Sequence, residues 1–342
     1  MTLEEEIMRY GSVAIVGLAK NAGKTECLNF ILRRLQDKGR LLGLTSIGVD
    51  GEDRDVVFRT EKPEVTVYEG SLFVTSETHY HGKRLVSEVL GVSERRTALG
   101  RLVTARACDS GKVILSGPPD TASLKTLISD LHGRGAATVI VDGALSRLSF
   151  SSPAVTEALV LATGAAVSNS IDGVVRRTRF VYDMISLPAV ADASLRASLA
   201  GIEKGVWGID DCGGVHDLEI PSLLMLDRHK DSIFSYGTTL YAPGAITEKL
   251  LAFLRSQPQC SRTTLIMRDF TRMFAEPATV AAYLQRGGRI EVLLKNRLLA
   301  ISINPRSPQG YILDSDRLRE ALQSHVDVPV YDVVREEMRQ GI

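Results

Sequence analysis

The sequence has no excess of charge of either sign. Its 342 residues include 41 Lys and Arg against 41 Asp and Glu, and 44% of them are hydrophobic. A protein that binds nucleic acid over much of its surface needs a strong positive balance, so the composition argues against nucleic acid as a partner. A local basic site is still compatible with it. A chain of this length usually exceeds one hydrophobic core, so we expect two domains.

Cysteines and long apolar runs are also scarce. The four cysteines are far apart in the sequence: Cys27, Cys108, Cys212 and Cys260. None has the spacing of a metal site, which predicts reduced thiols in a cytoplasmic protein. The longest apolar stretch, around residues 158–167, is interrupted by Gly164 and falls short of the roughly twenty residues that span a bilayer. Three glutamates near the N-terminus stand where a signal peptide carries positive charge, so we expect neither export nor a membrane partner.

Short aliphatic runs alternate with helical patterns in residues 1–200, as is typical of βαβ units. The clearest predicted strands are residues 12–16, 41–47, 112–116, 138–141 and 158–162. Helices are predicted over residues 25–38, before a capping Gly39, and over residues 122–131. The pattern predicts an α/β domain with a mainly parallel sheet and helices on both faces.

One segment departs from this alternation. The stretch VTVYEGSLFVTS, residues 65–76, alternates apolar and polar residues about Glu69 and Gly70. This pattern predicts a β-hairpin, inserted at about residues 62–80 on the edge of the sheet.

The pattern weakens again after residue 200. Residues 201–221 are rich in glycine and aspartate and predict a linker. Residues 222–342 resume the alternation and predict a smaller α/β domain that contacts a partner or substrate. Its predicted strands are residues 231–237, 263–270, 296–304 and 328–333, and its predicted helices are residues 247–257, 278–287 and 316–325.

The most informative stretch is VAIVGLAKNAGKTECLNFIL, residues 13–32, which is a strand, a polar loop bounded by glycines, and a helix. This order directs backbone N–H groups of the loop and the first helical turn towards an anion, which the helix dipole also favours. Gly17 would let the strand turn, and Gly23 would let the backbone approach a phosphate. Asn21 and Ala22 lie in the same loop and complete the predicted nucleotide-binding set.

Two residues follow the loop in the order that phosphate chemistry requires. Lys24 would reach the β- and γ-phosphates, and the hydroxyl of Thr25 would coordinate Mg²⁺. Five residues separate Gly17 from Gly23, one more than in the standard phosphate loop. This longer form resembles the Gly-x5-Gly-Lys-Thr loop of dethiobiotin synthetase and its relatives among P-loop NTPases.

Carboxylates for the metal are predicted at two strand ends. The segment TVIVDGAL, residues 138–145, ends a predicted buried strand with Asp142, in the manner of a Walker B aspartate. Asp50 follows the second strand and would also contact the metal, and Glu52 would orient a water; both residues also fit an ordinary acidic turn. Lys20 would stabilise charge on the transferred phosphoryl group, or it is a solvated loop lysine. ATP is preferred over GTP, because Ser170 replaces the lysine of a GTPase-like motif.

Four segments together resemble the small reactivase subunit of lysine 5,6-aminomutase, a family of bacterial lysine fermentation. They are GLAKNAGKT, GLTSIGVDGE, VDGALSRLSFSSP and NPRSPQGY. The resemblance implies a cytoplasmic P-loop protein that works with a MutS-like ATPase subunit on a cobalamin- and pyridoxal-phosphate-dependent aminomutase. Such factors use nucleotide to expel damaged cobalamin. The resemblance assigns the nucleotide site to Gly17, Gly23, Lys24, Thr25 and Asp142.

Two other functions fit the same loop. One is an ATP-dependent ligase of the dethiobiotin synthetase type, with a substrate carboxylate as phosphoryl acceptor, although Lys20 stands where that family has a threonine. The other is a regulatory module that binds nucleotide without turnover. A remodelling subunit is expected to hydrolyse faster with its target, and a ligase is expected to need only a small acceptor.

Overall fold

The computed structural model describes residues 2–47, 64–144, 155–220 and 232–339. The chain forms two compact units. Unit 1 comprises residues 1–179 and 297–342, and unit 2 comprises residues 180–296. The chain therefore leaves unit 1, forms unit 2 and returns to complete unit 1. These units differ from the two consecutive domains that the sequence predicted.

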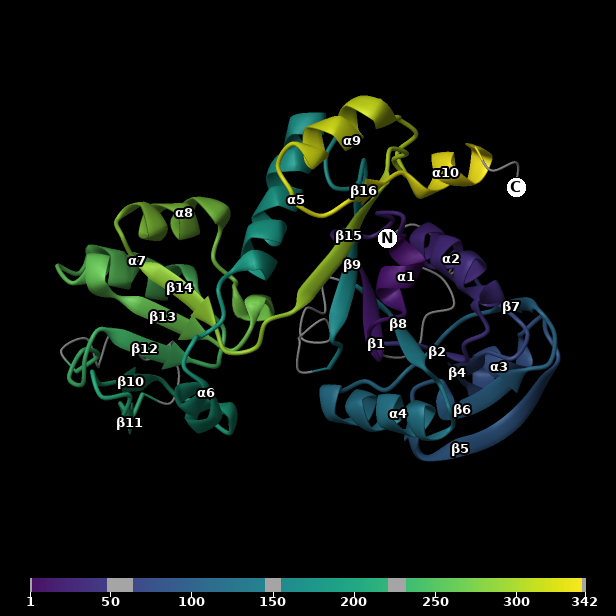
Figure 1. Cartoon of the computed structure of the whole chain (residues 1–342), viewed down its shortest axis with the longest axis horizontal. Helices are drawn as coiled ribbons and strands as arrows, with labels where there is room; N and C mark the ends of the chain where they lie inside the picture. Colours follow the sequence, from purple (N-terminus) through teal and green to yellow (C-terminus); the bar gives the residue numbers. More distant parts are fainter. Residues whose placement is uncertain (1, 48–63, 145–154, 221–231, 340–342) are drawn as a thin grey trace. The chain divides into compact units, whose positions relative to one another are not determined.

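Unit 1 is built on a nine-stranded sheet with the strand order β16-β15-β9-β1-β8-β2-β4-β6-β5 (Figure 1). The strands from β16 to β4 are parallel to one another, and β6 and β5 extend the sheet antiparallel. The bounds are β1 Ser12–Gly17, β2 Leu42–Ser46, β4 Leu72–Ser76, β5 Ser87–Thr97, β6 Gly100–Ala107, β8 Thr138–Ala144, β9 Ala158–Gly164, β15 Arg297–Asn304 and β16 Val330–Tyr331. The predicted α/β class with a mainly parallel sheet is confirmed.

Helices accompany this sheet on both faces (Figure 1). The helices of unit 1 are α1 Leu3–Ile7, α2 Lys24–Leu35 with the 3₁₀ turn Gln36–Lys38, α3 Glu77–His81, α4 Thr121–Gly133, α9 Ser315–Gln323 and α10 Val333–Arg339. Helix α5, Ile171–Ser186, carries the chain from unit 1 into unit 2. The helices predicted over residues 25–38 and 122–131 are confirmed, and Gly39 caps the first of them with a left-handed φ of 66°.

Alternating side chains place the two hydrophobic cores of unit 1 on opposite faces of the sheet. On β8, Ile140 packs into the core that includes the inner face of α2. Val139 and Val141, one residue to either side, pack into the core that includes α4. Strand β1 is buried along its whole length, as expected of a central parallel strand covered on both faces.

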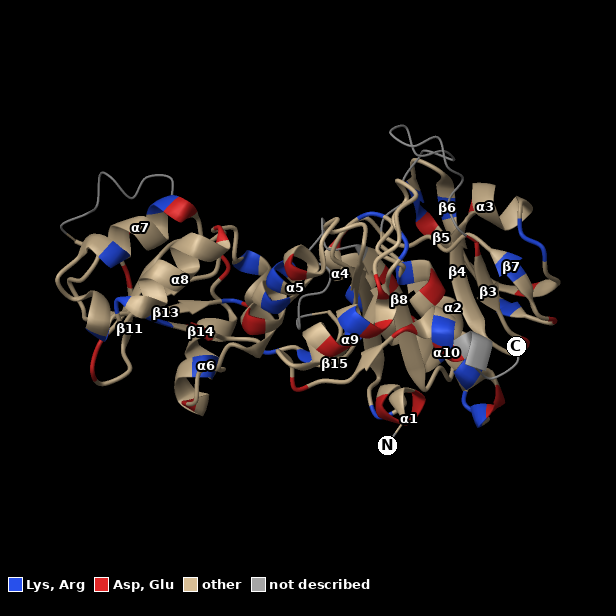
Figure 2. Ribbon diagram, turned by 90° about the horizontal axis from the view of Figure 1, so that it is seen from above, with Lys and Arg blue, Asp and Glu red and all other residues tan. Residues whose placement is uncertain are grey.

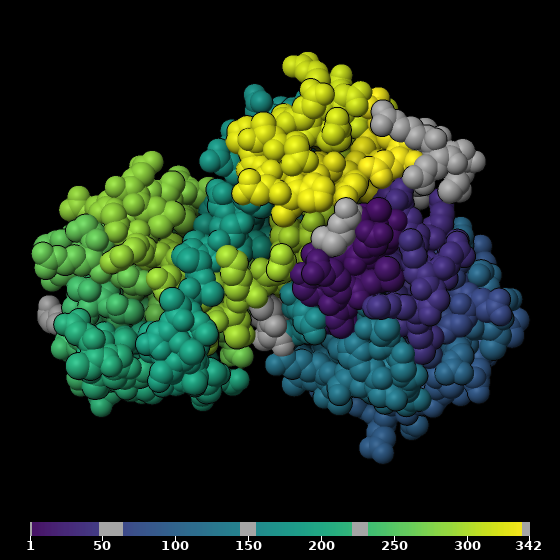
Figure 3. Space-filling view, in the orientation of Figure 1, coloured from purple at the N-terminus to yellow at the C-terminus, as the bar shows by residue number. Residues whose placement is uncertain are grey.

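The two ends of the described chain meet in unit 1. Arg34 of α2 forms ion pairs with Glu4 of α1, at 3.5 Å, and with Glu336 of α10, at 3.7 Å. Figure 3 shows the purple N-terminal residues beside the yellow C-terminal residues. The C-terminal segment is therefore part of the structure around α2.

Charges of both signs are interspersed over the ribbon in Figure 2. In the described ranges, no helix is both long enough and apolar enough to cross a bilayer.

The predicted hairpin is wrong. Strand β3, Val65–Val67, pairs with β7, Gly111–Val113, in a separate two-stranded sheet. Strand β4 instead joins the main sheet, between β2 and β6. Gly70 does reverse the chain with a φ of 83°. The prediction is wrong because every residue of β4 is buried. A buried strand of this kind lies inside a sheet with a neighbouring strand on each side, rather than in an isolated hairpin with the strand before the turn.

Unit 2 contains a five-stranded sheet with the order β11-β10-β12-β13-β14 among its described residues. Strands β12 to β14 are parallel, whereas β10 is antiparallel to both of its neighbours. The bounds are α6 Ala193–Ala200, β10 Trp207–Ile209, β11 Val215–Asp217, β12 Thr239–Ala242, α7 Glu248–Ser256, β13 Thr264–Met267, α8 Pro277–Gln285 and β14 Arg289–Val292, with 3₁₀ turns at Cys260–Arg262 and Phe270–Arg272.

Three predictions for the second half of the chain are corrected. The linker predicted over residues 201–221 contains β10 and β11. The strand predicted over residues 231–237 is a turn in its described part. The strands predicted over residues 296–304 and 328–333 exist as β15 and β16, but they belong to the sheet of unit 1. An apolar pattern predicts a strand but does not say which sheet the strand joins.

The turn between β10 and β11 is held by one aspartate. Oδ1 of Asp210 accepts the backbone N–H groups of Cys212, at 2.9 Å, and Gly214, at 2.8 Å. Its Oδ2 accepts Nε2 of His216 at 2.7 Å, and the His216 ring stacks on Tyr236 with centroids 4.1 Å apart. The bond from His216, followed by these backbone bonds, lowers the pKa of Asp210.

We expect an NMR titration to place the pKa of Asp210 below the ordinary aspartate value of about 3.9. Because the pKa is lower in the folded state, the stabilisation is present above that ordinary value and is lost as the pH falls through the folded pKa. His216→Ala removes the main cause and should raise the pKa. Tyr236→Leu, which removes only the stacked ring, is the control. An unchanged pKa in His216→Ala would contradict the assignment.

Candidate functional site

The loop between β1 and α2 is folded back on itself. The backbone N–H of Leu18 donates to the carbonyl of Ala162 on β9, at 2.9 Å, and Ala22 donates to Ala19, at 3.3 Å. Asn21 and Gly23 have left-handed φ values of 60° and 88°. Ala22 between them is 1% exposed. The loop therefore has a defined conformation that depends on two left-handed residues.

The two glycines of the loop have different roles. Gly17 has an ordinary φ, and a Cβ there would lie 3.3 Å from the carbonyl of Ala19, so it supplies room rather than a special backbone conformation. Gly23 needs both. A Cβ on Gly23 would lie 2.6 Å from the Cβ of Asn304, in addition to the strained φ.

Asn304 is the last residue of β15, and its position is fixed by the backbone. Its carbonyl accepts the N–H of Ala165, at 2.9 Å, and its side-chain Oδ1 accepts the N–H of Arg306, at 3.0 Å. Sequence reasoning missed this contact with Gly23. The pattern identified the strand and the Asn-Pro that ends it, but it placed them in the second domain.

Lys24 and Asp142 meet beside the loop. Nζ of Lys24 lies 3.0 Å from Oδ1 of Asp142, and the two side chains are 25% and 17% exposed. Strand β8 carries Asp142 next to β1, where it pairs with Ile15. The carbonyl of Asp142 accepts the Ser46 hydroxyl at 3.1 Å, which ties the aspartate to β2. The structure thus brings together a cation and a carboxylate that are far apart in the sequence.

The other predicted residues fall into two groups. Thr25 lies half-buried in the first turn of α2, and Lys20 is exposed in the loop. Asp50 and Glu52 lie outside the described residues. The structure therefore places the loop, Thr25 and Asp142 at the carboxyl ends of the central parallel strands β1 and β8. It does not describe Asp50 and Glu52, the other two predicted carboxylates.

The cysteine nearest the loop is not part of this chemistry. Cys27 lies on the inner face of α2, and burial raises the pKa of its thiol to about 12. A thiol with that pKa stays protonated near neutral pH and is a poor nucleophile. Cys27 therefore has a structural role in the core around α2.

The arrangement suits a bound anion with a metal ion. The loop leads into the amino end of α2, where the helix dipole favours negative charge. Lys24 carries a positive charge there, and Asp142 and Thr25 carry oxygen atoms of the kind that could hold Mg²⁺. The pair is largely buried, so separating its partners is favourable only when a ligand compensates both charges, as a phosphate on Lys24 and a metal ion on Asp142 would.

We expect Gly23→Ala to destabilise unit 1 more than Gly70→Ala. Both sites have a left-handed φ, which costs about 1–2 kcal/mol for alanine, but a Cβ on Gly70 meets nothing within 4 Å. The clash with Asn304 should add about 1–3 kcal/mol. Urea denaturation of the two variants measures the difference, and equal midpoints would show that Asn304 does not restrict the loop.

Comparisons with known proteins identify no relative of this chain. No protein-family model, no curated protein sequence and no solved structure matches it.

Proposed function

We propose that unit 1 binds Mg-ATP and that this chain is the nucleotide-driven subunit of a reactivating factor, which remodels a cobalamin-dependent lysine 5,6-aminomutase to release damaged cobalamin. The observation that carries the nucleotide part is the Lys24–Asp142 pair at 3.0 Å beside a loop with two left-handed residues. This combination fits a P-loop, in which one cation contacts phosphate and one carboxylate contacts the metal.

Each residue of the site has a task in this proposal. The loop from Gly17 to Gly23 would contact the phosphates with its remaining backbone N–H groups, since those of Leu18 and Ala22 donate to carbonyls of unit 1. Lys24 would leave Asp142 and contact the β- and γ-phosphates, and Asp142 and Thr25 would hold Mg²⁺. The metal, when bound, neutralises charge on the phosphates. ATP is the proposed nucleotide in preference to GTP.

The position of unit 2 in the chain supports a remodelling role. Its residues lie between α5 and β15, and β15 ends at Asn304, against Gly23. A change in loop conformation on nucleotide binding would move Gly23 relative to Asn304, and so would affect β15, the strand that follows unit 2. Phosphate-dependent rearrangement of this kind is a common way to convert nucleotide state into a change elsewhere.

The proposed partners are a MutS-like ATPase subunit and the aminomutase itself. This part depends on the four sequence segments that resemble the small reactivase subunit. The sequence contains one Asp-x-His-x-x-Gly match, at residues 130–135 at the carboxyl end of α4. Its side chains are engaged within unit 1, since Asp130 accepts Nε of Arg134 at 2.8 Å and Nδ1 of His132 lies 2.7 Å from the carbonyl of Ala136. In this proposal cobalamin is therefore held by the partner enzyme.

Lys24→Ala is expected to weaken ATP binding. Losing a charged contact to phosphate costs about 2–3 kcal/mol, or roughly a hundredfold in the dissociation constant. Lys38→Ala, in the 3₁₀ turn that follows the carboxyl end of α2, is the matched control and should bind as the wild type does. Titration with a fluorescent ATP analogue in the presence of Mg²⁺ measures both. Equal binding by the two variants would reject the phosphate site.

Turnover distinguishes remodelling from the other functions. We expect slow ATP hydrolysis by the chain alone and faster hydrolysis when aminomutase with inactivated cobalamin and the partner subunit are added. Hydrolysis that depends only on a small carboxylate acceptor would indicate a ligase instead. Binding without turnover in any mixture would indicate a regulatory module.

Asp142→Asn is expected to separate metal binding from phosphate binding. The amide keeps the size of the carboxylate but loses its charge. The factor by which Mg²⁺ increases ATP affinity should therefore be at least tenfold smaller in the variant than in the wild type. Binding of ATP without metal should be retained or improved, because Lys24 loses its competing partner. An unchanged response to Mg²⁺ would remove Asp142 from the metal site.

A further inference from the structure

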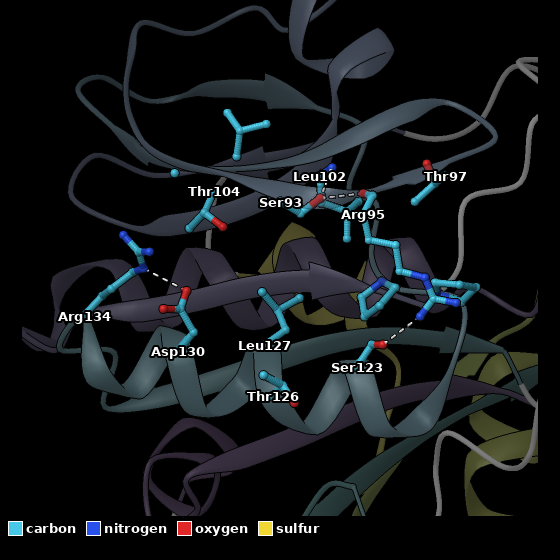
Figure 4. Close-up of a pocket in the computed structure, with 14 residues that line it drawn as sticks. Ser93, Arg95, Thr97, Leu102, Thr104, Ser123, Thr126, Leu127, Asp130 and Arg134 are labelled. Carbon is cyan, nitrogen blue, oxygen red and sulfur yellow. Dashed lines mark hydrogen bonds and ion pairs between the residues drawn. The ribbon is translucent and has the colours of Figure 1, made fainter.

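Unit 1 also contains a pocket that shares no lining residue with the loop after β1. A pocket of about 280 Å³ opens between α4 and the antiparallel strands β5 and β6 (Figure 4). The short segment before α4 closes one end of it, with Pro118 and Pro119. None of the residues assigned above to nucleotide or Mg²⁺ lines this pocket.

The middle of the pocket is apolar. Leu102 of β6 and Leu127 of α4 face each other across it in Figure 4, and Val92 of β5 also lines it. The two prolines add apolar surface without any N–H donor. Small-molecule sites in proteins are typically of this kind, with apolar walls and a few polar groups that orient the ligand.

A guanidinium group lies at one end of the pocket. Nε of Arg134 donates to Asp130 at 2.8 Å, and its Nη1 donates to the carbonyl of Leu90 at 3.1 Å. Gly91 permits this position, because a Cβ there would lie 3.3 Å from Nη2. These two bonds hold the guanidinium in place through Nε and Nη1, and the N–H groups of Nη2 take part in neither, so they can donate to a ligand.

A second guanidinium group lies at the opposite end (Figure 4). Nη1 of Arg95 donates to Asp120 at 2.9 Å and to the Ser123 hydroxyl at 3.3 Å. Ser93, between the two ends, is also fixed, since its Oγ donates to the carbonyl of Arg95 and accepts the N–H of Leu102. Arg134 and Ser93 are thus positioned before any ligand binds, which favours affinity. The Arg95 side chain is 70% exposed, so its pair with Asp120 holds it only weakly.

We propose that this pocket binds an amphiphilic carboxylate, with its chain between Leu102 and Leu127 and its carboxylate on Nη2 of Arg134. Each of the two guanidinium groups is already paired with a carboxylate, Arg134 with Asp130 and Arg95 with Asp120, so an anion would be held by the N–H donors that these pairs leave unused. An anion with an apolar body matches both the donors and the walls. This site is independent of the proposed nucleotide function.

Octanoate is the probe, with octanol and octylamine as neutral and cationic probes of the same chain length. Isothermal titration of the full chain should show octanoate binding at least about tenfold tighter than either, because only the carboxylate accepts a charged hydrogen bond from Arg134. Amide NMR shifts on octanoate addition should concentrate in β5, β6 and α4. Equal affinity for octanol would overturn the assigned role of the guanidinium.

Two tryptophan variants on one helix test the location. Thr126 lines the pocket and Ser129 does not, and both are exposed on α4. Thr126→Trp should fill the pocket and abolish octanoate binding, whereas Ser129→Trp should bind as the wild type does. Arg134→Gln should reduce octanoate affinity about tenfold and leave octanol unchanged. Octanoate binding that survives Thr126→Trp, or no octanoate binding by the wild type, would overturn the proposal.

Discussion

The parallel pairing of β1 with β8 is the interaction on which the candidate site depends. Its register places Ile15 opposite Asp142, one strand away from the loop that follows Gly17. Because side chains alternate between the faces of a strand, a shift of one residue would turn Asp142 away from Lys24. The burial of both strands on both faces fixes this register, so the hydrophobic core determines the geometry of two charged residues.

The return of the chain from unit 2 is the second constraint. Strand β15 joins the main sheet beside β9 and ends where Asn304 meets Gly23. A glycine is therefore needed for two reasons, a left-handed backbone and the lack of space for a side chain. This contact connects the loop to the strand that follows unit 2, which is why we favour a nucleotide-dependent change of arrangement over simple binding.

The two sites of unit 1 differ in how their charges are used. Lys24 and Asp142 are partners that a ligand would separate. Arg134 and Asp130 are partners that hold one guanidinium still, so that its remaining donors can meet a ligand without losing the existing bonds. The first arrangement suits a site that alternates between states, and the second suits a preformed pocket.

The sequence by itself determined the local features: the strand, loop and helix of residues 12–38, the α/β class, and the placement of Asp142 on a buried strand, which in the structure continues to Ala144. These depend on periodicity, glycine chemistry and short-range order, which a single sequence contains. Only the tertiary structure decided that β4 does not pair with β3, that β15 belongs to the nine-stranded sheet of unit 1, and that Asn304 contacts Gly23. Strand partners are chosen by the burial of whole faces, between residues far apart in the chain, and no local pattern records that choice.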